Sequence, residues 1–331
     1  MTNMPSAYRS EINWASSKKS IFDVFNISAP GQVPVFESND RFLQKTSQHY
    51  RFQKDQLRGL LAFLFAASKG DALLVHGPFG SGKTSLVREV LGRLQWPTLM
   101  LSWSEKSDSM ELIGRQGIQF GDTVFDYGPL ALAAKLGLVL VINEIDRGRA
   151  GDLVGLNDLL DGGNLVIKET GEVIEPHPNF RVICTANSAG SGDLSGQYVG
   201  SVRKLDPAFL DRFAMIKVDY MDQTDELDLL MLQFPDYARK SSMFLRMLTQ
   251  FASETRAKAT DVAENLSTPI STRAIMRTLN LGRSMGLLRR IGESDFSISD
   301  DLLPAIELSY LNRLPAEERE AAVKTLELCM G

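Results

Sequence analysis

The most informative stretch of this chain is Gly77-Pro78-Phe79-Gly80-Ser81-Gly82-Lys83-Thr84. It matches the phosphate-binding loop pattern G-x-x-x-x-G-K-[ST] at every required position. The loop follows residues 72–76, a short apolar run typical of a buried strand, and it precedes residues 85–91, whose apolar spacing indicates a helix. Context and pattern therefore favour a phosphate-binding loop over an ordinary glycine turn.

The residue types in this loop suit a nucleoside triphosphate. Glycines allow successive backbone N–H groups to turn toward a polyphosphate, and the N-terminus of the following helix adds its dipole. Lys83 is expected to reach the terminal phosphates, and Thr84 to offer a hydroxyl to Mg²⁺. The predicted nucleotide-binding residues are Gly77, Pro78, Phe79, Gly80, Ser81, Gly82, Lys83, Thr84 and Ser85.

Composition limits the class of protein. The chain has 331 residues, of which 44% are hydrophobic, and this length allows two domains with a substantial core. A formal charge of −5 argues against sequence-independent binding of nucleic acid across the whole protein surface. Two cysteines, Cys184 and Cys329, are too few for a disulfide framework or a metal cluster.

No segment of the sequence is typical of a membrane span or a secretory signal. The longest apolar stretch, residues 57–75, is interrupted by Arg58, Lys69 and Asp71, and the N-terminus is polar. We therefore expect no membrane partner and a cytoplasmic protein.

The pattern along the chain predicts an α/β fold with a helical second domain. Residues 1–54 form an N-terminal arm that we expect to dock on a neighbouring subunit. Residues 55–220 form a large domain with a five-stranded parallel sheet, and residues 221–331 form a helical lid. The predicted strands are residues 72–76, 98–101, 138–142, 180–184 and 214–218. The predicted lid helices lie within residues 227–234, 243–251, 274–288 and 316–328.

Polar side chains follow two of these strands. Asn143 and Glu144 end the strand at 138–142, where an acidic pair typically serves the metal and the water beside a triphosphate. Glu144 is the candidate for polarising the attacking water. Asn143 stands where an Asp is usual, so Mg²⁺ affinity should be weaker unless Asp146 compensates. The alternative is a strand end whose polar side chains face solvent.

Three further residues complete the candidate site. Asn187 follows the strand at 180–184 at the same sheet edge and can orient the water, although an Asn there is also a common turn residue. Arg212 precedes the last strand, where it can act on the nucleotide of a ring neighbour; the alternative is an ion pair with Asp211 or Asp206. Arg273 opens a lid helix and can fold onto the γ-phosphate, or it is a surface Arg.

Taken in order, these motifs resemble those of the AAA+ ATPases, and within them the MoxR group, which includes the CobS, NorQ and CbbQ families. The strongest likeness is to the CobS family of ATPase subunits of aerobic cobaltochelatase. It departs at Asn143 and in the residues around His76, Pro78 and Phe79. Beyond the motifs above, it extends over residues 24–27, 33–36, 50–52, 94–97, 108–114, 176–181, 185–188, 192–193, 196–198 and 266–268.

The resemblance implies roles for the candidate residues. ATP and Mg²⁺ are the implied ligands, with Thr84, Asn143 and Glu144 at the metal. Glu144 is then the catalytic residue, and Asn187, Arg212 and Arg273 correspond to the first sensor, the arginine finger and the second sensor. The resemblance also implies a hexameric homo-oligomeric ring. Its partner would carry a von Willebrand factor A domain, as CobT does, and in a chelatase there would be a large catalytic subunit as well.

Two β-hairpins are expected as insertions in the large domain. One lies within residues 108–130, and the second lies within residues 164–174 with Gly171 at its turn. By the resemblance, both would face the pore or the partner. Ordinary surface hairpins are the alternative.

The sequence leaves several functions open. The leading hypothesis is a ring-forming Mg²⁺-dependent ATPase that remodels or activates a partner protein. The alternatives are a cobaltochelatase subunit in the strict sense, a nucleic-acid motor of a DNA-processing complex, and a nucleotide-gated scaffold that hydrolyses little. His49, His76 and His177 are scattered along the sequence, so cobalt chelation itself would belong to another subunit.

Overall fold

The computed structural model describes residues 12–38, 41–119, 122–148, 153, 156–192, 202–260, 266–290, 296–298 and 303–330. These residues divide into two compact units. The large unit comprises described residues 12–77, 82–192 and 202–218. The lid unit comprises residues 78–81 and the described residues from 219 onward.

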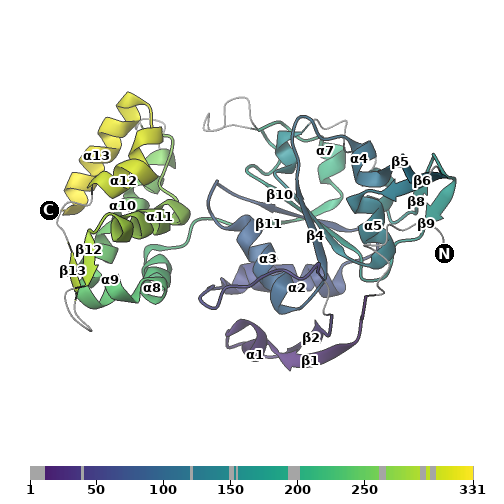
Figure 1. The fold of residues 1–331 in the computed structure, drawn as a ribbon, viewed down its shortest axis with the longest axis horizontal. Helices are drawn as coiled ribbons and strands as arrows, with labels where there is room; N and C mark the ends of the chain where they lie inside the picture. Colours follow the sequence, from purple (N-terminus) through teal and green to yellow (C-terminus); the bar gives the residue numbers. More distant parts are fainter. Residues whose placement is uncertain are drawn as a thin grey trace. The chain divides into compact units, whose positions relative to one another are not determined.

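A five-stranded parallel sheet with the order β11-β3-β10-β7-β4 forms the centre of the large unit (Figure 1). Each strand overlaps one predicted from the sequence, so the predicted α/β fold is confirmed. Because the strands are parallel, the phosphate loop after β3 and the polar residues after β7 and β10 meet at one edge. The strands are β3 (Ala72–His76), β4 (Thr98–Ser102), β7 (Val139–Asn143), β10 (Arg181–Ala186) and β11 (Phe213–Lys217).

Side chains along these strands alternate between two hydrophobic cores, one on each face of the sheet. Leu73 and Val75 of β3 pack with α2 (Lys54–Ala66) and α3 (Lys83–Arg93). Leu74 belongs to the opposite core, with α5 (Pro129–Leu136), α6 (Asn157–Leu160) and α7 (Pro207–Leu210). Burial on both faces explains why the three central strands, β3, β7 and β10, are mostly apolar runs.

The N-terminal arm packs on its own chain. Its described part contains β1 (Ser16–Ser20), α1 (Ile21–Phe25) and β2 (Gln32–Phe36), which lie along the lower side of the large unit in Figure 1. Phe25 and Phe36 are 2% and 7% exposed and share a core with α2, α3 and Trp96. The expectation that these apolar segments dock on a neighbouring subunit is therefore wrong for them, because they cover the core of the large unit.

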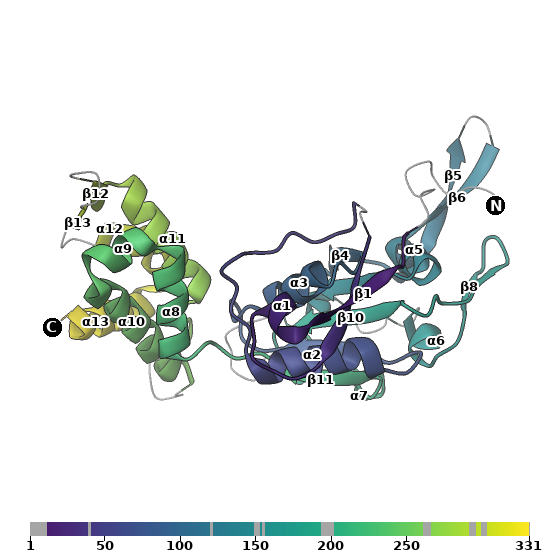
Figure 2. The ribbon, with the colours of Figure 1, turned by 90° about the horizontal axis from the view of Figure 1, so that it is seen from below.

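The two predicted hairpins are confirmed. One pairs β5 (Gly114–Gln119) with β6 (Asp122–Tyr127), between α4 (Ser109–Ile113) and α5. The other pairs β8 (Leu165–Ile167) with β9 (Glu172–Ile174), and Gly171 has a φ of +73° at its turn. Figures 1 and 2 both show the hairpins at the same end of the large unit.

A short polar cluster joins the two hairpins to each other. Glu172 accepts hydrogen bonds from the Tyr127 hydroxyl at 2.5 Å and from Lys135 Nζ of α5 at 2.7 Å. Lys135 Nζ also lies 3.1 Å from the Tyr127 oxygen. The last residue of one hairpin, the first strand residue of β9 and a core helix are thus held together.

The lid unit is mainly helical, as predicted, and has its own core. Leu230, Leu248, Phe251, Ile275 and Ile306 are among its fully buried residues. One predicted helix is too long: residues 274–288 include the end of α11, but Gly286 has a φ of +76° and Leu288 begins a strand. The elements are α8 (Gln223–Gln233), α9 (Pro235–Lys240), α10 (Ser242–Thr260), α11 (Thr272–Ser284), β12 (Leu288–Arg290), β13 (Phe296–Ile298), α12 (Leu303–Ser309), η4 (Leu311–Arg313) and α13 (Ala316–Met330).

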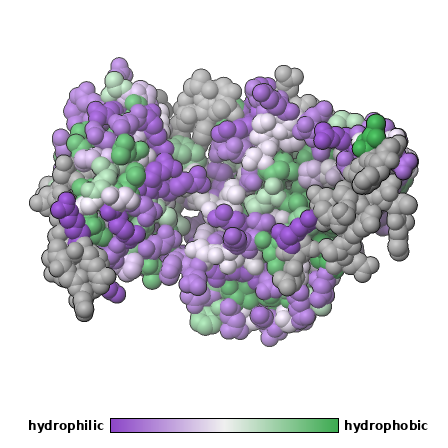
Figure 3. Space-filling model, in the orientation of Figure 1, coloured by the Kyte–Doolittle hydropathy of each residue, from purple (hydrophilic) through white to green (hydrophobic). Residues whose placement is uncertain are grey.

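Among the described residues, the helices are all too short or too polar to cross a bilayer. On the face of the molecule in Figure 3, hydrophilic and hydrophobic residues are interspersed.

Candidate active site

The phosphate loop has the backbone that its glycines predict. Gly77, Gly80 and Gly82 have φ values of +151°, +71° and +98°. Residues with a Cβ atom disfavour such positive φ values, whereas glycine adopts them readily. A Cβ on Gly77 would overlap the carbonyl group of Val218. The buried Ser81 hydroxyl of the same loop has no hydrogen-bond partner within the structure, so a polar group remains available to a ligand there.

Lys83 connects the loop to the end of β10. It is the first residue of α3, and its Nζ donates to Gly77 O at 2.8 Å and to Asn187 Oδ1 at 3.0 Å. The side chain is nearly buried, with 9% of the residue exposed. The structure thus brings Lys83 and Asn187 together across 104 residues of sequence, as the shared sheet edge predicts.

Thr84 and Asn143 place two oxygen atoms side by side. The Thr84 hydroxyl donates to Asn143 Oδ1 at 2.9 Å, and the Thr185 hydroxyl donates to the same oxygen at 3.3 Å. Asn143 Nδ2 donates to Leu101 O at 3.2 Å, which fixes the orientation of the amide. Oxygen ligands are those that Mg²⁺ prefers, so the chemistry of this pair fits a magnesium ion.

Glu144 occupies an unusual backbone conformation directly after β7. Its φ and ψ are 57° and 45°, a left-handed conformation that costs a residue with a side chain about 1–2 kcal/mol. Its N–H donates to the Thr185 hydroxyl at 3.1 Å, and its carboxylate pairs with Arg147 at 3.1 Å. Such strained residues cluster at functional sites. The sequence reasoning missed both Thr185 and Arg147.

Asp146 is hydrogen-bonded to the backbone that follows β10. It is fully buried, and its Oδ2 accepts hydrogen bonds from the backbone N–H groups of Asn187 at 2.7 Å and Ser188 at 3.2 Å. Burial raises the pKa of this carboxyl above its ordinary value, although the two N–H groups and Lys83 act in the opposite direction. Asp146 therefore anchors the segment that carries Asn187.

Arg212 forms an ion pair that neither sequence alternative named. Its Nε and Nη2 donate to the two carboxylate oxygens of Asp161 at 2.6 and 2.9 Å, and Nη1 donates to Ala208 O at 2.5 Å. Asp206, one expected partner, instead caps α7 by accepting from Ala208 N. Hydrogen bonding between the two partners raises the pKa of Arg212 and lowers that of Asp161.

Arg273 lies in the lid unit as the second residue of α11, and it is exposed. The predicted cap is confirmed, since Ser271 Oγ accepts from Ala274 N at 3.3 Å. The resemblance segments at 193 and 196–198 lie outside the described residues.

Comparison with known proteins shows an AAA domain in the large unit. Residues 72–213 match the family described as AAA domain (dynein-related subfamily). CobS, an aerobic cobaltochelatase subunit from Sinorhizobium sp, is 25% identical over 94% of this chain and 90% of its own length. NorQ from Paracoccus denitrificans is 28% identical over 67% of this chain and 80% of its own. CbbQ from Hydrogenophilus thermoluteolus is 24% identical over 55% of this chain and 64% of its own.

The sheet order, the phosphate loop and the similarity to these relatives all indicate an ATPase. The chain contains an AAA domain and is an ATPase, and it is similar to CobS, NorQ and CbbQ, which are MoxR-type AAA+ ATPases.

Proposed function

We propose that this ATPase forms a ring of six copies, and that ATP hydrolysis between neighbouring copies remodels a partner protein. The observation that carries the catalytic part is the position of Lys83, whose ammonium lies between Gly77 O and Asn187 Oδ1. This group is buried in the loop, where the β- and γ-phosphates of ATP would replace these acceptors.

Each residue at the sheet edge has a task in this proposal. The loop N–H groups and Lys83 bind the phosphates, and Asn187 orients the attacking water. A Mg²⁺ ion held by Thr84, Asn143 and Glu144 would neutralise phosphate charge. Glu144 accepts a hydrogen bond from the attacking water. Its carboxylate is paired with Arg147, so this ion pair must first break. Pairs as exposed as this one contribute about 0–1 kcal/mol, so opening is easy.

Arg212 and Arg273 complete the proposed site. Arg212 lies at the surface before β11, and its side chain is 27% exposed. In a ring it would exchange Asp161 for the phosphates of the adjacent copy. Arg273, at the start of α11, would contact the γ-phosphate. Guanidinium groups suit both tasks because they keep their charge and bind phosphate oxygens in pairs.

The catalytic assignment is tested by Glu144→Gln. This change keeps the shape of the side chain and removes its charge, so ATP should still bind while kcat falls about 100-fold or more. Glu327→Gln, on the exposed surface of α13, is the matched control and should hydrolyse ATP normally. Normal turnover by the Glu144 variant would exclude the proposed role.

The ring is tested by mass measurement in solution. The Glu144→Gln protein with ATP should assemble into hexamers, while a protein that stays monomeric under these conditions would contradict the proposal. The oligomer is also required for Arg212 to act on a neighbouring nucleotide.

The proposed partner carries a von Willebrand factor A domain, on the basis of the resemblance to the CobS family. Affinity capture with the ATP-loaded Glu144→Gln variant should retain such a protein. The net charge of −5 makes nucleic acid a less suitable partner, and added DNA should leave ATP turnover unchanged. DNA-stimulated hydrolysis would favour the nucleic-acid motor instead.

A second candidate function is that of a cobaltochelatase subunit. The similarity to CobS over 94% of this chain favours it. In that case capture should also recover a large chelatase subunit, and the reconstituted complex should insert cobalt into a corrinoid only with ATP. Recovery of the factor A domain protein alone would favour a separate remodelling task.

A further inference from the structure

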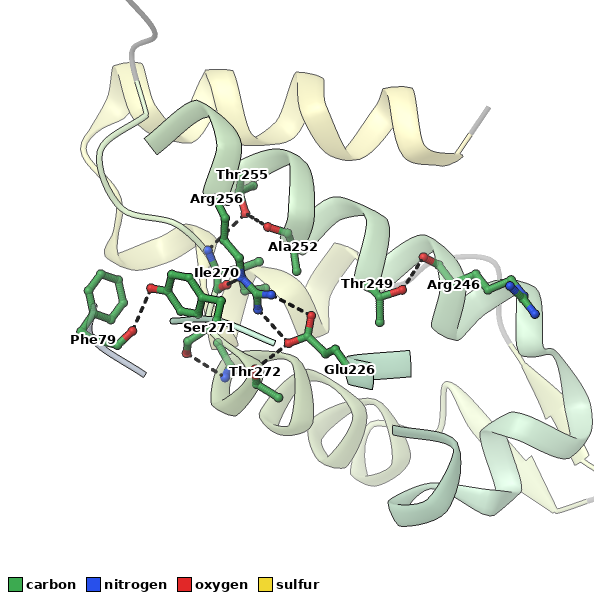
Figure 4. A network of polar contacts seen from close by, with 12 residues as sticks. Phe79, Glu226, Arg246, Thr249, Ala252, Thr255, Arg256, Ile270, Ser271 and Thr272 are labelled. Atoms are coloured by element: carbon green, nitrogen blue, oxygen red, sulfur yellow. Dashed lines mark hydrogen bonds and ion pairs between the residues drawn. The ribbon is translucent and has the colours of Figure 1, made fainter. Parts of the chain in front are cut away.

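A buried ion pair lies in the lid unit beside the start of α11. Glu226 of α8 is completely buried, and its two oxygens accept from Arg256 Nη1 at 2.9 Å and Nη2 at 2.7 Å (Figure 4). Replacing such a pair by apolar residues is often neutral for stability, so stability alone does not explain why the pair is present. The contacts of Glu226 and Arg256 indicate a role in positioning other residues.

Both members of the pair hold the residues that begin α11. Glu226 Oε1 also accepts from the Thr272 hydroxyl at 2.5 Å, and Arg256 Nε donates to Ile270 O at 3.2 Å. Thr255, the neighbour of Arg256, accepts from Ile270 N at 3.3 Å. Residues 270–272 are therefore fixed from α8 and from α10, and Arg273 follows them directly.

The same pair reaches the phosphate loop through Tyr220. The Arg256 guanidinium lies over the Tyr220 ring at 4.5 Å, and the Tyr220 hydroxyl donates to Phe79 O at 2.8 Å. The next residue, Gly80, is packed so closely that an added Cβ would lie 2.5 Å from Ser271 Cβ. The loop residues of the lid unit thus contact the start of α11 directly and through Tyr220.

The Tyr220 contact also orients a donor group of the loop. The carbonyl of Phe79 and the N–H of Gly80 belong to one planar trans peptide unit, in which they point in opposite directions. When Tyr220 holds that carbonyl, the Gly80 N–H must point away from Tyr220. The backbone N–H groups of such loops are the phosphate ligands, so the hydroxyl fixes the orientation of one of them.

We propose that Tyr220, Arg256 and Glu226 are positioning residues, which couple the orientation of the Phe79–Gly80 peptide to the placement of Arg273. Nucleotide in the loop then stabilises the start of α11, and an ordered α11 in turn favours the nucleotide-binding form of the loop. This inference rests on the proposed function, because Arg273 is assigned to the γ-phosphate there.

Tyr220→Phe is the direct test, because it removes one hydroxyl and keeps the ring beside Arg256. A single hydrogen bond of this kind corresponds to about a three- to tenfold change in affinity, so ATP should bind that much more weakly. Tyr237→Phe is the matched control: its hydroxyl donates to Leu279 O at 2.9 Å within the lid, away from the loop. That variant should bind ATP normally.

Hydrogen exchange separates positioning from a merely structural role. In the unaltered protein and in Tyr237→Phe, ATP should slow the exchange of amides in residues 270–280. In Tyr220→Phe this ATP-dependent protection should be lost, while exchange without nucleotide stays similar. Arg256→Lys, which keeps the charge but not the two-point contact, should also lose it.

Two outcomes keep this inference distinct from the proposed function. If Tyr220→Phe matches Tyr237→Phe in both ATP affinity and protection, the coupling is excluded, whatever the ATPase rate. If Arg273→Ala hydrolyses ATP at the normal rate, the assigned role of Arg273 is wrong, while the exchange experiment still decides whether the loop and α11 are coupled.

Discussion

The Thr84 hydroxyl donates to the side-chain oxygen of Asn143 at 2.9 Å, which joins the start of α3 to the end of β7. Two oxygens meet there, but neither carries a charge. Of the three residues proposed to hold a divalent cation, Glu144 is the one with a carboxylate.

Asn143→Asp should strengthen Mg²⁺ binding. The added charge lies where the ion is proposed to bind, and affinity for such cations rises with the number of charged ligands, so the Mg²⁺ concentration for half-maximal ATP turnover should fall about tenfold. A magnesium titration at saturating ATP measures it. Asn280→Asp, on the exposed face of α11, controls for net charge. An unchanged titration curve for Asn143→Asp would place the ion elsewhere.

Arg212 should act across a subunit boundary. Arg212→Ala and Lys83→Ala should each lower kcat by about a thousandfold, the range expected for an arginine finger. Mixing the two inactive proteins creates boundaries with an intact Lys83 on one copy and an intact Arg212 on the next. Turnover should therefore reappear in the mixture and not in either protein alone. A mixture that stays inactive would show that Arg212 does not act in trans.

The packing of the arm leads to a contrast between two phenylalanines of α1. Phe25 is 2% exposed, and Phe25→Ala should destabilise the large unit by about 3–5 kcal/mol. Phe22, on the same short helix, is 57% exposed, so Phe22→Ala should leave stability nearly unchanged. Thermal unfolding measures both. If Phe22→Ala instead weakens oligomer formation, the outer face of the arm contacts a neighbour.

The contribution to stability of the contacts between Glu172, Lys135 and Tyr127 should depend on pH. Burial acts to raise the pKa of Glu172, but the hydrogen bonds from Lys135 and Tyr127 outweigh it and hold that pKa below its ordinary value of 4.5. A lowered pKa in the folded state means that the contribution to stability is present above pH 4.5 and is lost as the pH falls through the folded value. Glu172→Gln should thus lower the melting temperature more at pH 7 than at pH 3. Glu169→Gln, exposed in the same hairpin, is the control, and an equal loss at both pH values would contradict the ion-pair explanation.

Local patterns in the sequence were sufficient for the framework of the fold. The glycines and Lys83 of the loop, the apolar runs of the strands and the positions of Asn143, Glu144 and Asn187 after them are all signals within a few residues. Parallel pairing then places these strand ends at one edge, so the contact between Lys83 and Asn187 followed from topology.

Pairings set by tertiary packing were not predictable in the same way. Arg212 pairs with Asp161, 51 residues away, rather than with the nearby Asp206, which is occupied as a helix cap. Tyr220 reaches Phe79 across 141 residues. The apolar segments of the arm are visible in the sequence, but an apolar pattern does not say whether the surface that covers them belongs to the same chain or to another.

The cluster at Glu172 has a mechanical consequence. Because this carboxylate is bonded to Tyr127 and to Lys135, neither hairpin can tilt without breaking these contacts or moving α5. That helix shares its core with β7, the strand that ends in Asn143. A pull on either hairpin would therefore act through one short helix on the strand that ends at the site proposed for the nucleotide.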